Sequence, residues 1–330
     1  MSRKTGPLVL SRKTGPLVSS RRAGPVNCAV ERRERSGSDL GRMASVSIQR
    51  DDVVMSTSQP FEYVLGSGDH ELDRLAFQQS VWAEQTEAWL DLLELKPGCC
   101  VLDAGCGPGE VLALLAQRVG PDGQLVGVDD SERWIEHVQS RSEAERWPQT
   151  ELQQGRLESI AADGSFDARF DGIFCRWVLS FPPDPGSLVQ RFARWLKTGG
   201  VLVVVDYNHE GVSLFPESAG FRAVIRATRA WYESRGGSAF VAGQLPRLIR
   251  ESGLQLTEQL PIVRSGGPGT PVWSWAEEFF VPHSHSMEQA GLLSAEEGET
   301  FRSEWAERRE DPDACFYSPI VVGFAARRSE

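Results

Sequence analysis

Three glycines at alternate positions mark the stretch of the chain that is best suited to hold a ligand. Gly105, Gly107 and Gly109 follow the apolar residues 100–102 and precede the helix-forming residues 111–116. Because glycine has no Cβ, the backbone can turn sharply there and a ligand can lie against the peptide groups. The N–H groups at the start of the helix would then face that ligand. The sequence therefore predicts a strand, a ligand-binding turn and a helix.

The spacing of these glycines argues against two common phosphate sites. The dinucleotide pattern Gly-x-Gly-x-x-Gly would need a glycine where this chain has Glu110. The phosphate-binding P-loop needs Gly-Lys-Ser/Thr, and no such run follows. Asp103 stands just before the glycines, where its charge disfavours a pyrophosphate. That position suits a ligand with a positive charge.

A second acidic position ends the next predicted strand. Residues 124–128 predict a strand that ends at Asp129 and Asp130, and residues 132–145 predict the helix that follows. An acidic side chain about 20 residues beyond a glycine turn is where a ribose is held through its hydroxyls. Asp103 and Asp129 together therefore indicate one nucleoside-containing ligand.

The segment Asp-x-Gly-x-Gly-x-Gly resembles the first motif of the class I S-adenosylmethionine-dependent methyltransferases. The segments Phe-Asp-x-x-x-x-Arg at residues 170–176 and Leu-Lys-x-Gly-Gly at residues 196–200 resemble later motifs of that family. The resemblance covers residues 63–207 well and extends more loosely to the C-terminus. It implies S-adenosyl-L-methionine as the cofactor. It also implies an α/β fold with a doubly wound, seven-stranded, mostly parallel Rossmann-like sheet, an antiparallel last strand, a helical lid and an insertion.

The resemblance also implies which residues contact the cofactor. Tyr63 would close on the methionine end from the lid or would cap the core. The family usually has an apolar residue against the adenine, where this chain has Asp130. The family's adenine-reading acid after the third strand is replaced by Arg156, so the backbone of Leu157, the Glu158 carboxylate or shape alone would hold the adenine. The expected cofactor-binding residues are Tyr63, Asp103, Gly105, Cys106, Gly107, Gly109, Asp129, Asp130, Leu157, Glu158 and Cys175.

The methyl acceptor should lie past the carboxyl ends of the fourth and fifth strands, predicted at residues 170–179 and 201–207. Because S-adenosylmethionine carries its own leaving group, the protein mainly positions the acceptor and excludes water. The candidate catalytic residues are Arg176, Tyr207 and His209. His209 is either a general base, which only a hydroxyl or protonated amine would need, or a surface histidine. Arg176 would bind an acceptor carboxylate or phenolate, or a backbone carbonyl.

The other parts of the chain are predicted to cover this core. Residues 72–93 have helical periodicity, and Trp82 and Trp89 on it are expected in the core. Aromatic residues 273–280 would line an apolar cavity or pack between helices. A helix end is expected at Pro282, and no metal site is expected at the nearby histidines. Further predicted elements are a strand at 150–155, helices at 184–196, 217–234 and 244–251, a strand at 254–263, a capping box at Ser294 and a last strand at 317–324.

Composition restricts the class of protein further. The 330 residues carry a net charge of −11, which argues against a general nucleic-acid binder. Six cysteines without a Cys-x-x-Cys pattern indicate neither a disulfide framework nor a zinc site and favour the reducing cytoplasm. No apolar run approaches the roughly 20 residues of a membrane span, so no membrane partner is expected.

The first residues differ from the others in charge and complexity. Residues 1–42 hold 10 Lys/Arg and 3 Asp/Glu, with a repeated Ser-Arg-Lys-Thr-Gly-Pro-Leu-Val, and predict disorder. Three interpretations stay open, namely an artefact or inert tail upstream of a start at Met43, a targeting segment or a basic contact arm. The expected divisions are a basic tail at 1–45, lid helices at 46–98, the cofactor-binding core at 99–210 and the insertion with the acceptor-pocket wall at 211–330.

These observations predict a methyltransferase that acts on a small, apolar or aromatic metabolite by O-, N- or C-methylation. The family resemblance is to enzymes of quinone and natural-product pathways. One alternative is a protein or RNA methyltransferase, which the acidic body and the absence of an Asn/Asp-Pro-Pro-Tyr motif disfavour. A second alternative is a non-catalytic S-adenosylmethionine-binding protein. A nicotinamide-dependent dehydrogenase is the weakest alternative, because the glycine spacing disagrees with it. The acceptor, the methylated atom and the oligomeric state do not follow from the sequence.

Overall fold

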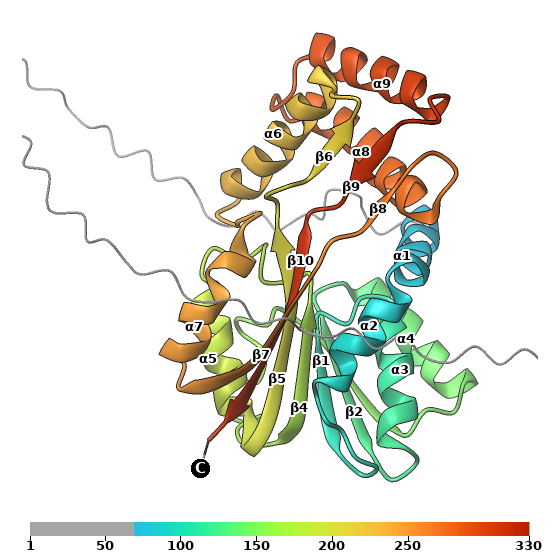
Figure 1. The fold of residues 1–330 in the computed structure, drawn as a ribbon. Coiled ribbons are helices and arrows are strands. Elements are labelled where there is room, and N and C mark those ends of the chain that lie inside the picture. The colour runs from blue at the N-terminus through green and yellow to red at the C-terminus, as the bar shows by residue number, and fades with distance from the viewer. Residues whose placement is uncertain (1–68, 330) are drawn as a thin grey trace, which may run out of the picture. The chain divides into compact units, whose positions relative to one another are not determined.

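A seven-stranded sheet lies at the centre of residues 69–329, which are those that the computed structural model describes (Figure 1). The strand order is β3-β2-β1-β4-β5-β10-β7, and β10 alone runs antiparallel to its neighbours. This confirms the predicted doubly wound, mostly parallel sheet with an antiparallel last strand. The strands are β1 (Cys100–Ala104), β2 (Gln124–Asp129), β3 (Gln149–Gln154), β4 (Phe170–Arg176), β5 (Leu196–Asn208), β7 (Leu254–Ile262) and β10 (Ile320–Arg328).

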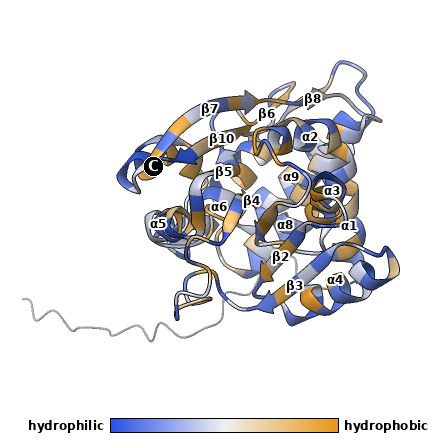
Figure 2. Cartoon of the chain, turned by 90° about the horizontal axis from the view of Figure 1, so that it is seen from below, coloured by the Kyte–Doolittle hydropathy of each residue, from blue (hydrophilic) through white to orange (hydrophobic). Residues whose placement is uncertain are grey.

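Helices cover both faces of the sheet, and the strands alternate their side chains between two apolar layers. On β4, Phe174 packs in one layer, while Ile173 and Cys175 pack in the other. In Figure 2, α3 and α5 lie on opposite sides of the central strands. The first layer is covered by α2 (Ala83–Asp91), α3 (Glu110–Val119) and α4 (Glu132–Ala144), and the second by α5 (Pro185–Trp195) and α7 (Leu245–Glu251).

A second group of helices lies beyond the carboxyl ends of the parallel strands (Figure 1). It carries a small three-stranded sheet in the order β6-β9-β8. None of the helices in residues 69–329 is long and apolar enough to cross a bilayer. The elements of this group are α1 (Asp69–Val81), β6 (Ser213–Phe215), α6 (Ala219–Ser234), β8 (Ser265–Gly266), α8 (Pro271–Gln289), α9 (Ala295–Arg309) and β9 (Cys315–Tyr317). The short 3₁₀ helix η1 (Val241–Gly243) precedes α7 and packs in the second apolar layer.

Helix starts predicted from the sequence carry the expected caps. The Asp184 carboxylate accepts a hydrogen bond from the Ser187 N–H at 3.0 Å and so caps α5. At α9, Ser294 and Glu297 form the reciprocal capping box that the sequence predicts. Each such cap satisfies N–H groups that have no partner within the helix.

Three predicted boundaries were wrong, and the first is the start of β5, which lies at Leu196 instead of residue 201. Helix α8 continues through Pro282 to Gln289, although proline removes one backbone hydrogen bond. Buried side chains on both sides of the proline, such as Phe280 and Met287, hold the helix in place. The last strand is divided after β9, because the Ser318 N–H donates to the Arg264 carbonyl instead of continuing the ladder. Tertiary packing around Pro282 and the hydrogen bond between Ser318 and Arg264 therefore override the structure that the local sequence predicts.

We expect Gly323→Ala to lower the free energy of unfolding by about 1–3 kcal/mol through overpacking. A Cβ at Gly323 in β10 would lie 2.3 Å from Cδ1 of Trp89, so α2 packs directly on the strand. Urea unfolding measures the change. Gly243→Ala is the control, since a Cβ there meets nothing within 4 Å. Equal stability of the two variants would contradict this packing.

Candidate functional site

The glycine loop joins β1 to α3 in a conformation that side chains disfavour. The φ angles of Gly105, Gly107 and Gly109 are +81°, +50° and +83°. A Cβ at Gly105 would lie 2.4 Å from Cγ2 of Val178, whereas a Cβ at Gly107 would meet nothing within 4 Å. The loop therefore packs against the segment after β4 on one side. At Gly107 the backbone is open to a ligand, as the sequence predicts.

Asp129, at the end of β2, fastens this loop. Its Oδ2 accepts a hydrogen bond from the Gly107 N–H at 2.8 Å, and its Oδ1 accepts one from the Ser131 N–H at 3.0 Å. Burial raises the pKa of Asp129 to about 6, although both backbone N–H groups lower it. A carboxylate oxygen has two lone pairs, so each oxygen can also accept from a ribose hydroxyl. The sequence predicts the ribose position but not the bond to the loop.

Asp103, near the end of β1, has an unsatisfied carboxylate. Only 2% of the residue is exposed, and its Oδ2 has no hydrogen-bond partner in the structure. Burial raises the pKa of Asp103 to about 7, with a smaller contribution from Asp129, while Arg176 lowers it. Leaving a buried carboxylate oxygen unpaired is costly. The ammonium group of S-adenosylmethionine is a suitable partner, so this position fits the cofactor.

Arg176 ends β4 and is anchored to helix α2. Its guanidinium donates to Oγ1 of Thr86 at 2.6 Å and lies 4.5 Å from the centre of the Trp177 ring. Burial lowers the pKa of Arg176 to about 10, and the charge of Asp103 raises it. Arg176 is therefore a cation at neutral pH. The only sequence signal for the Thr86 contact is a polar residue within an apolar helical pattern.

The residue after Arg176 is held in a strained conformation. Trp177 has a φ of +57°, which is costly for a bulky side chain. Its N–H donates to the Val205 carbonyl at 2.8 Å, and its ring stacks on Tyr207 with centroids 5.7 Å apart and planes 2° apart. The surrounding structure thus fixes one face of the indole above the carboxyl ends of β4 and β5.

His209 is buried next to these aromatic rings. It is 4% exposed, and the edges of the Tyr207 and Tyr232 rings lie against it at 5.7 and 6.0 Å. Its carbonyl accepts a hydrogen bond from Arg229. Burial and, to a smaller extent, the charge of Arg229 lower the pKa of His209 to about 3. The imidazole is therefore neutral, and a proton on it is disfavoured; its role as a general base stays a prediction.

The predicted adenine end is less well defined. Asp130 is exposed, and the exposed Glu158 pairs with Arg156 at 3.3 Å. Tyr63 lies outside the described residues. The predicted contacts whose side chains pack in the apolar layers are Cys106, Leu157 and Cys175.

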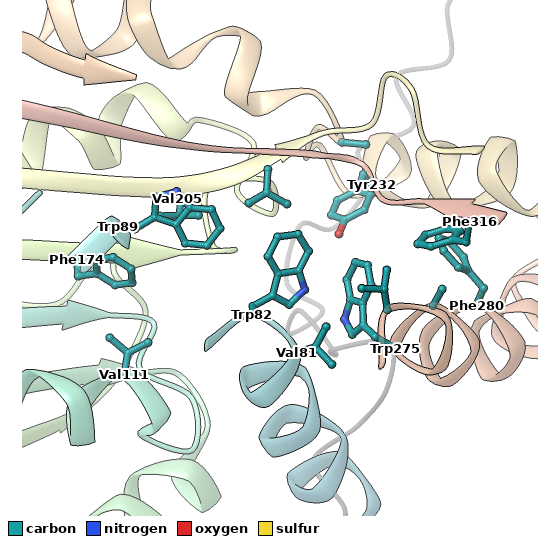
Figure 3. Close-up of a cluster of buried hydrophobic side chains, with 14 of the residues drawn as sticks. Val81, Trp82, Trp89, Val111, Phe174, Val205, Tyr232, Trp275, Phe280 and Phe316 are labelled. Carbon is teal, nitrogen blue, oxygen red and sulfur yellow. The ribbon is translucent and has the colours of Figure 1, made fainter. Parts of the chain in front are cut away.

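Trp82 connects the cofactor side with the second group of helices (Figure 3). Its ring stacks on Trp89 with centroids 6.1 Å apart, and it meets Trp177 and Trp275 edge-on at 6.0 and 5.4 Å. Figure 3 also shows the Tyr232 hydroxyl pointing toward this cluster. The sequence places Trp82 in the core, which is correct. The sequence does not show that Trp82 also adjoins the site, because α1 and α8 come into contact only in the folded protein.

A sheet of this order, with a glycine loop after β1 and a buried acid at the end of β2, is the arrangement expected of a nucleoside-binding α/β protein. The sequence profile of a methyltransferase-domain family matches residues 95–242. A ubiquinone biosynthesis O-methyltransferase of Leptothrix cholodnii is 30% identical over 176 residues, which cover 53% of this chain and 69% of that protein. The chain therefore belongs to the class I S-adenosylmethionine-dependent methyltransferases, and S-adenosyl-L-methionine is its cofactor.

Other comparisons give two further relatives in sequence and one similar fold. A trans-aconitate 2-methyltransferase of Azoarcus sp. is 33% identical over 45% of this chain and 61% of its own length. An uncharacterized 37.1 kDa protein in a transposon of Streptomyces fradiae is 31% identical over 58% of this chain and 53% of its own length. The chain thus spans between 53% and 69% of these three relatives. A crystal structure of a proposed methyltransferase from Bacillus halodurans superposes with a TM-score of 0.53, 21% identity and coverage of 75% of this chain and 100% of that one.

We expect Asp129→Ala to raise the Kd for S-adenosylhomocysteine, the cofactor product, by about 10- to 100-fold. The variant loses the ribose acceptor and the 2.8 Å hydrogen bond that fastens Gly107. Calorimetric titration measures the change. Asp122→Ala, at an exposed carboxylate in the loop before β2, is the control and should bind within about threefold of the wild type. If both variants bind alike, Asp129 does not hold the cofactor.

The buried Asp103 carboxyl predicts pH-dependent cofactor binding. Since the carboxyl must be ionised to hold an ammonium group, affinity for S-adenosylhomocysteine should fall as the pH drops through about 7. Asp129 adds a second loss near pH 6. Asp103→Asn should bind weakly and lack the upper part of this profile. Calorimetric titration between pH 5.5 and 8.5 checks both expectations.

The same substitution should stabilise the ligand-free protein. The pKa of Asp103 is raised in the folded state, so stability falls as the pH rises from the unfolded value toward about 7. Asp103→Asn removes this penalty, and its thermal midpoint at pH 8 should therefore exceed that of the wild type. A lower midpoint would show that Asp103 contributes to folding.

Proposed function

We propose that this protein transfers the methyl group of S-adenosylmethionine to a small, apolar or aromatic molecule bound beyond the carboxyl ends of β4 and β5. The main support is the aromatic wall at these strand ends. Trp177 and Tyr207 stack in parallel, and Trp82 meets Trp177 edge-on. Planar acceptors pack well on such faces, because offset and edge-to-face contacts between rings are favourable.

The wall adjoins the cofactor site through one short segment. Val178, next to Trp177, lies against Gly105 of the glycine loop. Asp206 near the end of β5 also holds this segment, residues 177–180, because its carboxylate accepts a hydrogen bond from the Ser180 N–H at 3.1 Å. A fixed segment between cofactor and acceptor supports in-line transfer, which depends on the position of the two reacting atoms.

The arrangement supports a reaction in which the acceptor needs little help from a base. The neutral His209 can share a hydrogen bond with an acceptor, but taking up its proton would place a second cation near Arg229. Arg176 and Tyr207 complete the polar groups that were predicted at this edge. Buried aromatic rings around them exclude water, which protects the sulfonium methyl group from side reactions.

The relatives that are named for an acceptor act in ubiquinone biosynthesis, on trans-aconitate and on 2-phytyl-1,4-naphthoquinone. The aromatic wall of this chain favours a ring-bearing acceptor of the quinone or natural-product type over a small carboxylic acid. The five cysteines within the described residues are all free thiols. They support the cytoplasmic location that we propose on the basis of the cysteine pattern.

The acceptor class is tested by incubating the protein with methyl-labelled S-adenosylmethionine and a panel of hydroquinones, catechols, carboxylic acids and isoprenoids. Mass spectrometry detects the methylated product, and release of S-adenosylhomocysteine gives the rate. Transfer to a ring-bearing compound is expected. Methylation confined to protein or RNA in an added extract would contradict a small-molecule acceptor.

With the acceptor that this panel identifies, Trp177→Ala should lower kcat/KM at least tenfold. Binding of S-adenosylhomocysteine should stay within about threefold, because the indole stacks on Tyr207, while Val178 is the residue that lies against the glycine loop. Trp177→Phe, which keeps a stacking face, should fall between the wild type and the alanine variant. An alanine variant with unchanged kcat/KM would show that this wall does not contact the acceptor.

A further inference from the structure

A buried tyrosine that is not among the predicted site residues directs its hydroxyl toward the aromatic wall. Tyr232 lies in the last turn of α6, and only 6% of the residue is exposed. Figure 3 shows its hydroxyl pointing toward the cluster that contains Trp82 and Trp275. Because Trp82 also meets Trp177, this cluster is continuous with the wall on which we place the acceptor.

We propose that Tyr232 determines which acceptors this enzyme binds, because its hydroxyl forms a hydrogen bond with an oxygen atom on the acceptor ring. The acceptor is then a ring that carries a hydroxyl or carbonyl group, and neither a plain hydrocarbon nor a cationic amine fills the site as well. This inference rests on the proposed function, since it concerns the molecule that lies on the aromatic wall.

The backbone fixes Tyr232 relative to the end of β4. Its carbonyl accepts a hydrogen bond from the Gly237 N–H at 2.9 Å. A Cβ at Gly237 would lie 2.3 Å from the carbonyl oxygen of Ser180, so the loop after α6 packs directly on the segment that follows β4. The Ser238 N–H donates to the same Ser180 carbonyl at 2.8 Å. Tyr232 is therefore tied to the short segment that carries Trp177.

The ring of Tyr232 is enclosed by three other rings. Its centre lies 5.5 Å from that of Phe181, and it meets His209 and Trp231 edge-on at 6.0 and 5.2 Å. These contacts restrict both side-chain torsions of the tyrosine, so its hydroxyl keeps one direction. A group that is already ordered loses little entropy when it binds a ligand.

Two further polar atoms of the wall can only donate hydrogen bonds. The indole Nε1 atoms of Trp82 and Trp177 are buried and have no hydrogen-bond partner within the described structure. Three core indoles share this property, so an unpartnered N–H by itself does not indicate a ligand; they are Trp89, Trp195 and Trp273. Beside a tyrosine hydroxyl with a fixed direction, the two donors of the wall favour an acceptor that offers lone pairs.

The charges near the wall favour an oxygen atom over an ammonium group. The guanidinium of Arg176 lies 4.5 Å from the centre of the Trp177 ring, and Arg229 donates to the His209 carbonyl. The sulfonium of a bound cofactor adds a third positive charge. Asp103, the buried carboxylate that interacts with Arg176, is the position that fits the ammonium of the cofactor. A cationic acceptor would therefore meet repulsion, whereas the lone pairs of a hydroxyl or carbonyl oxygen would not.

Two matched pairs of probes test this assignment without methyl transfer. In the first pair, 2-naphthol carries a hydroxyl where 2-methylnaphthalene carries a methyl group of similar size. In the second pair, 2-naphthalenemethanol carries a hydroxyl where 2-naphthylmethylamine carries an ammonium at neutral pH. Equilibrium dialysis against the protein saturated with S-adenosylhomocysteine measures the Kd of each probe.

Tyr232→Phe removes only the hydroxyl and should raise the Kd of 2-naphthol by about three- to tenfold, as expected for one hydrogen bond. The Kd of 2-methylnaphthalene should change by less than about twofold, since it makes no such bond. Binding of S-adenosylhomocysteine, measured by calorimetry, should also be unchanged and so shows that the variant is folded. Tyr317→Phe is the matched control, because Tyr317 on β9 is 40% exposed, and it should change none of these values.

The second pair tests the effect of charge in the wild type. 2-Naphthylmethylamine should bind at least about tenfold more weakly than 2-naphthalenemethanol, because its ammonium adds a cation to a site that already holds several. An amine that binds as tightly as the alcohol would overturn the preference for oxygen.

Equal weakening of 2-naphthol and 2-methylnaphthalene in Tyr232→Phe would overturn the proposal and indicate a packing role for this residue. An unchanged Kd for 2-naphthol would overturn it as well, as would a wild type that binds none of the probes. A selective loss of 2-naphthol in a protein that methylates no compound of the acceptor panel would contradict the proposed function alone. The two proposals can therefore fail separately.

Discussion

A carboxylate buried without a partner, at Asp103, is the constraint around which this structure is arranged. The protein contributes a cation, Arg176, whose charge reduces the cost of that burial without removing it. The glycine loop brings the backbone close to the same point, and Asp129 fastens the loop from the neighbouring strand. In the ligand-free state the buried carboxylate has no partner and destabilises the protein, whereas a bound cofactor would supply that partner. Binding of S-adenosylmethionine should consequently stabilise the fold, as linkage requires.

The acceptor side is built on a different principle. It has few polar groups with defined partners, and its shape comes from aromatic rings that four separated parts of the chain contribute. The strained backbone of Trp177 is held by β5, and Trp82, between α1 and α2, meets Trp275 of α8, which is far from it in sequence. Differences in the second group of helices would thus change the acceptor without disturbing the cofactor site.

The sequence predicts the sheet and the cofactor loop well because both depend on local patterns. Alternating glycines, apolar strands and an acid after β2 are each visible without the fold. The direction in which a side chain points at a strand end is harder to predict, as Cys175 shows. It adjoins Arg176 and was expected at the cofactor, but alternation along β4 directs its side chain into the opposite apolar layer. The local sequence pattern does not predict contacts between distant elements, such as that of Thr86 with Arg176. It also does not predict that packing extends α8 past Pro282.

The most direct test of these assignments is a crystal structure of the protein with S-adenosylhomocysteine. We expect the ammonium of the ligand at hydrogen-bonding distance from Oδ2 of Asp103 and the ribose hydroxyls on the carboxylate of Asp129. The loop around Gly107 should lie directly against the ligand. A complex in which Asp103 stays without a partner, or in which the nucleoside binds away from Asp129, would contradict the site described here.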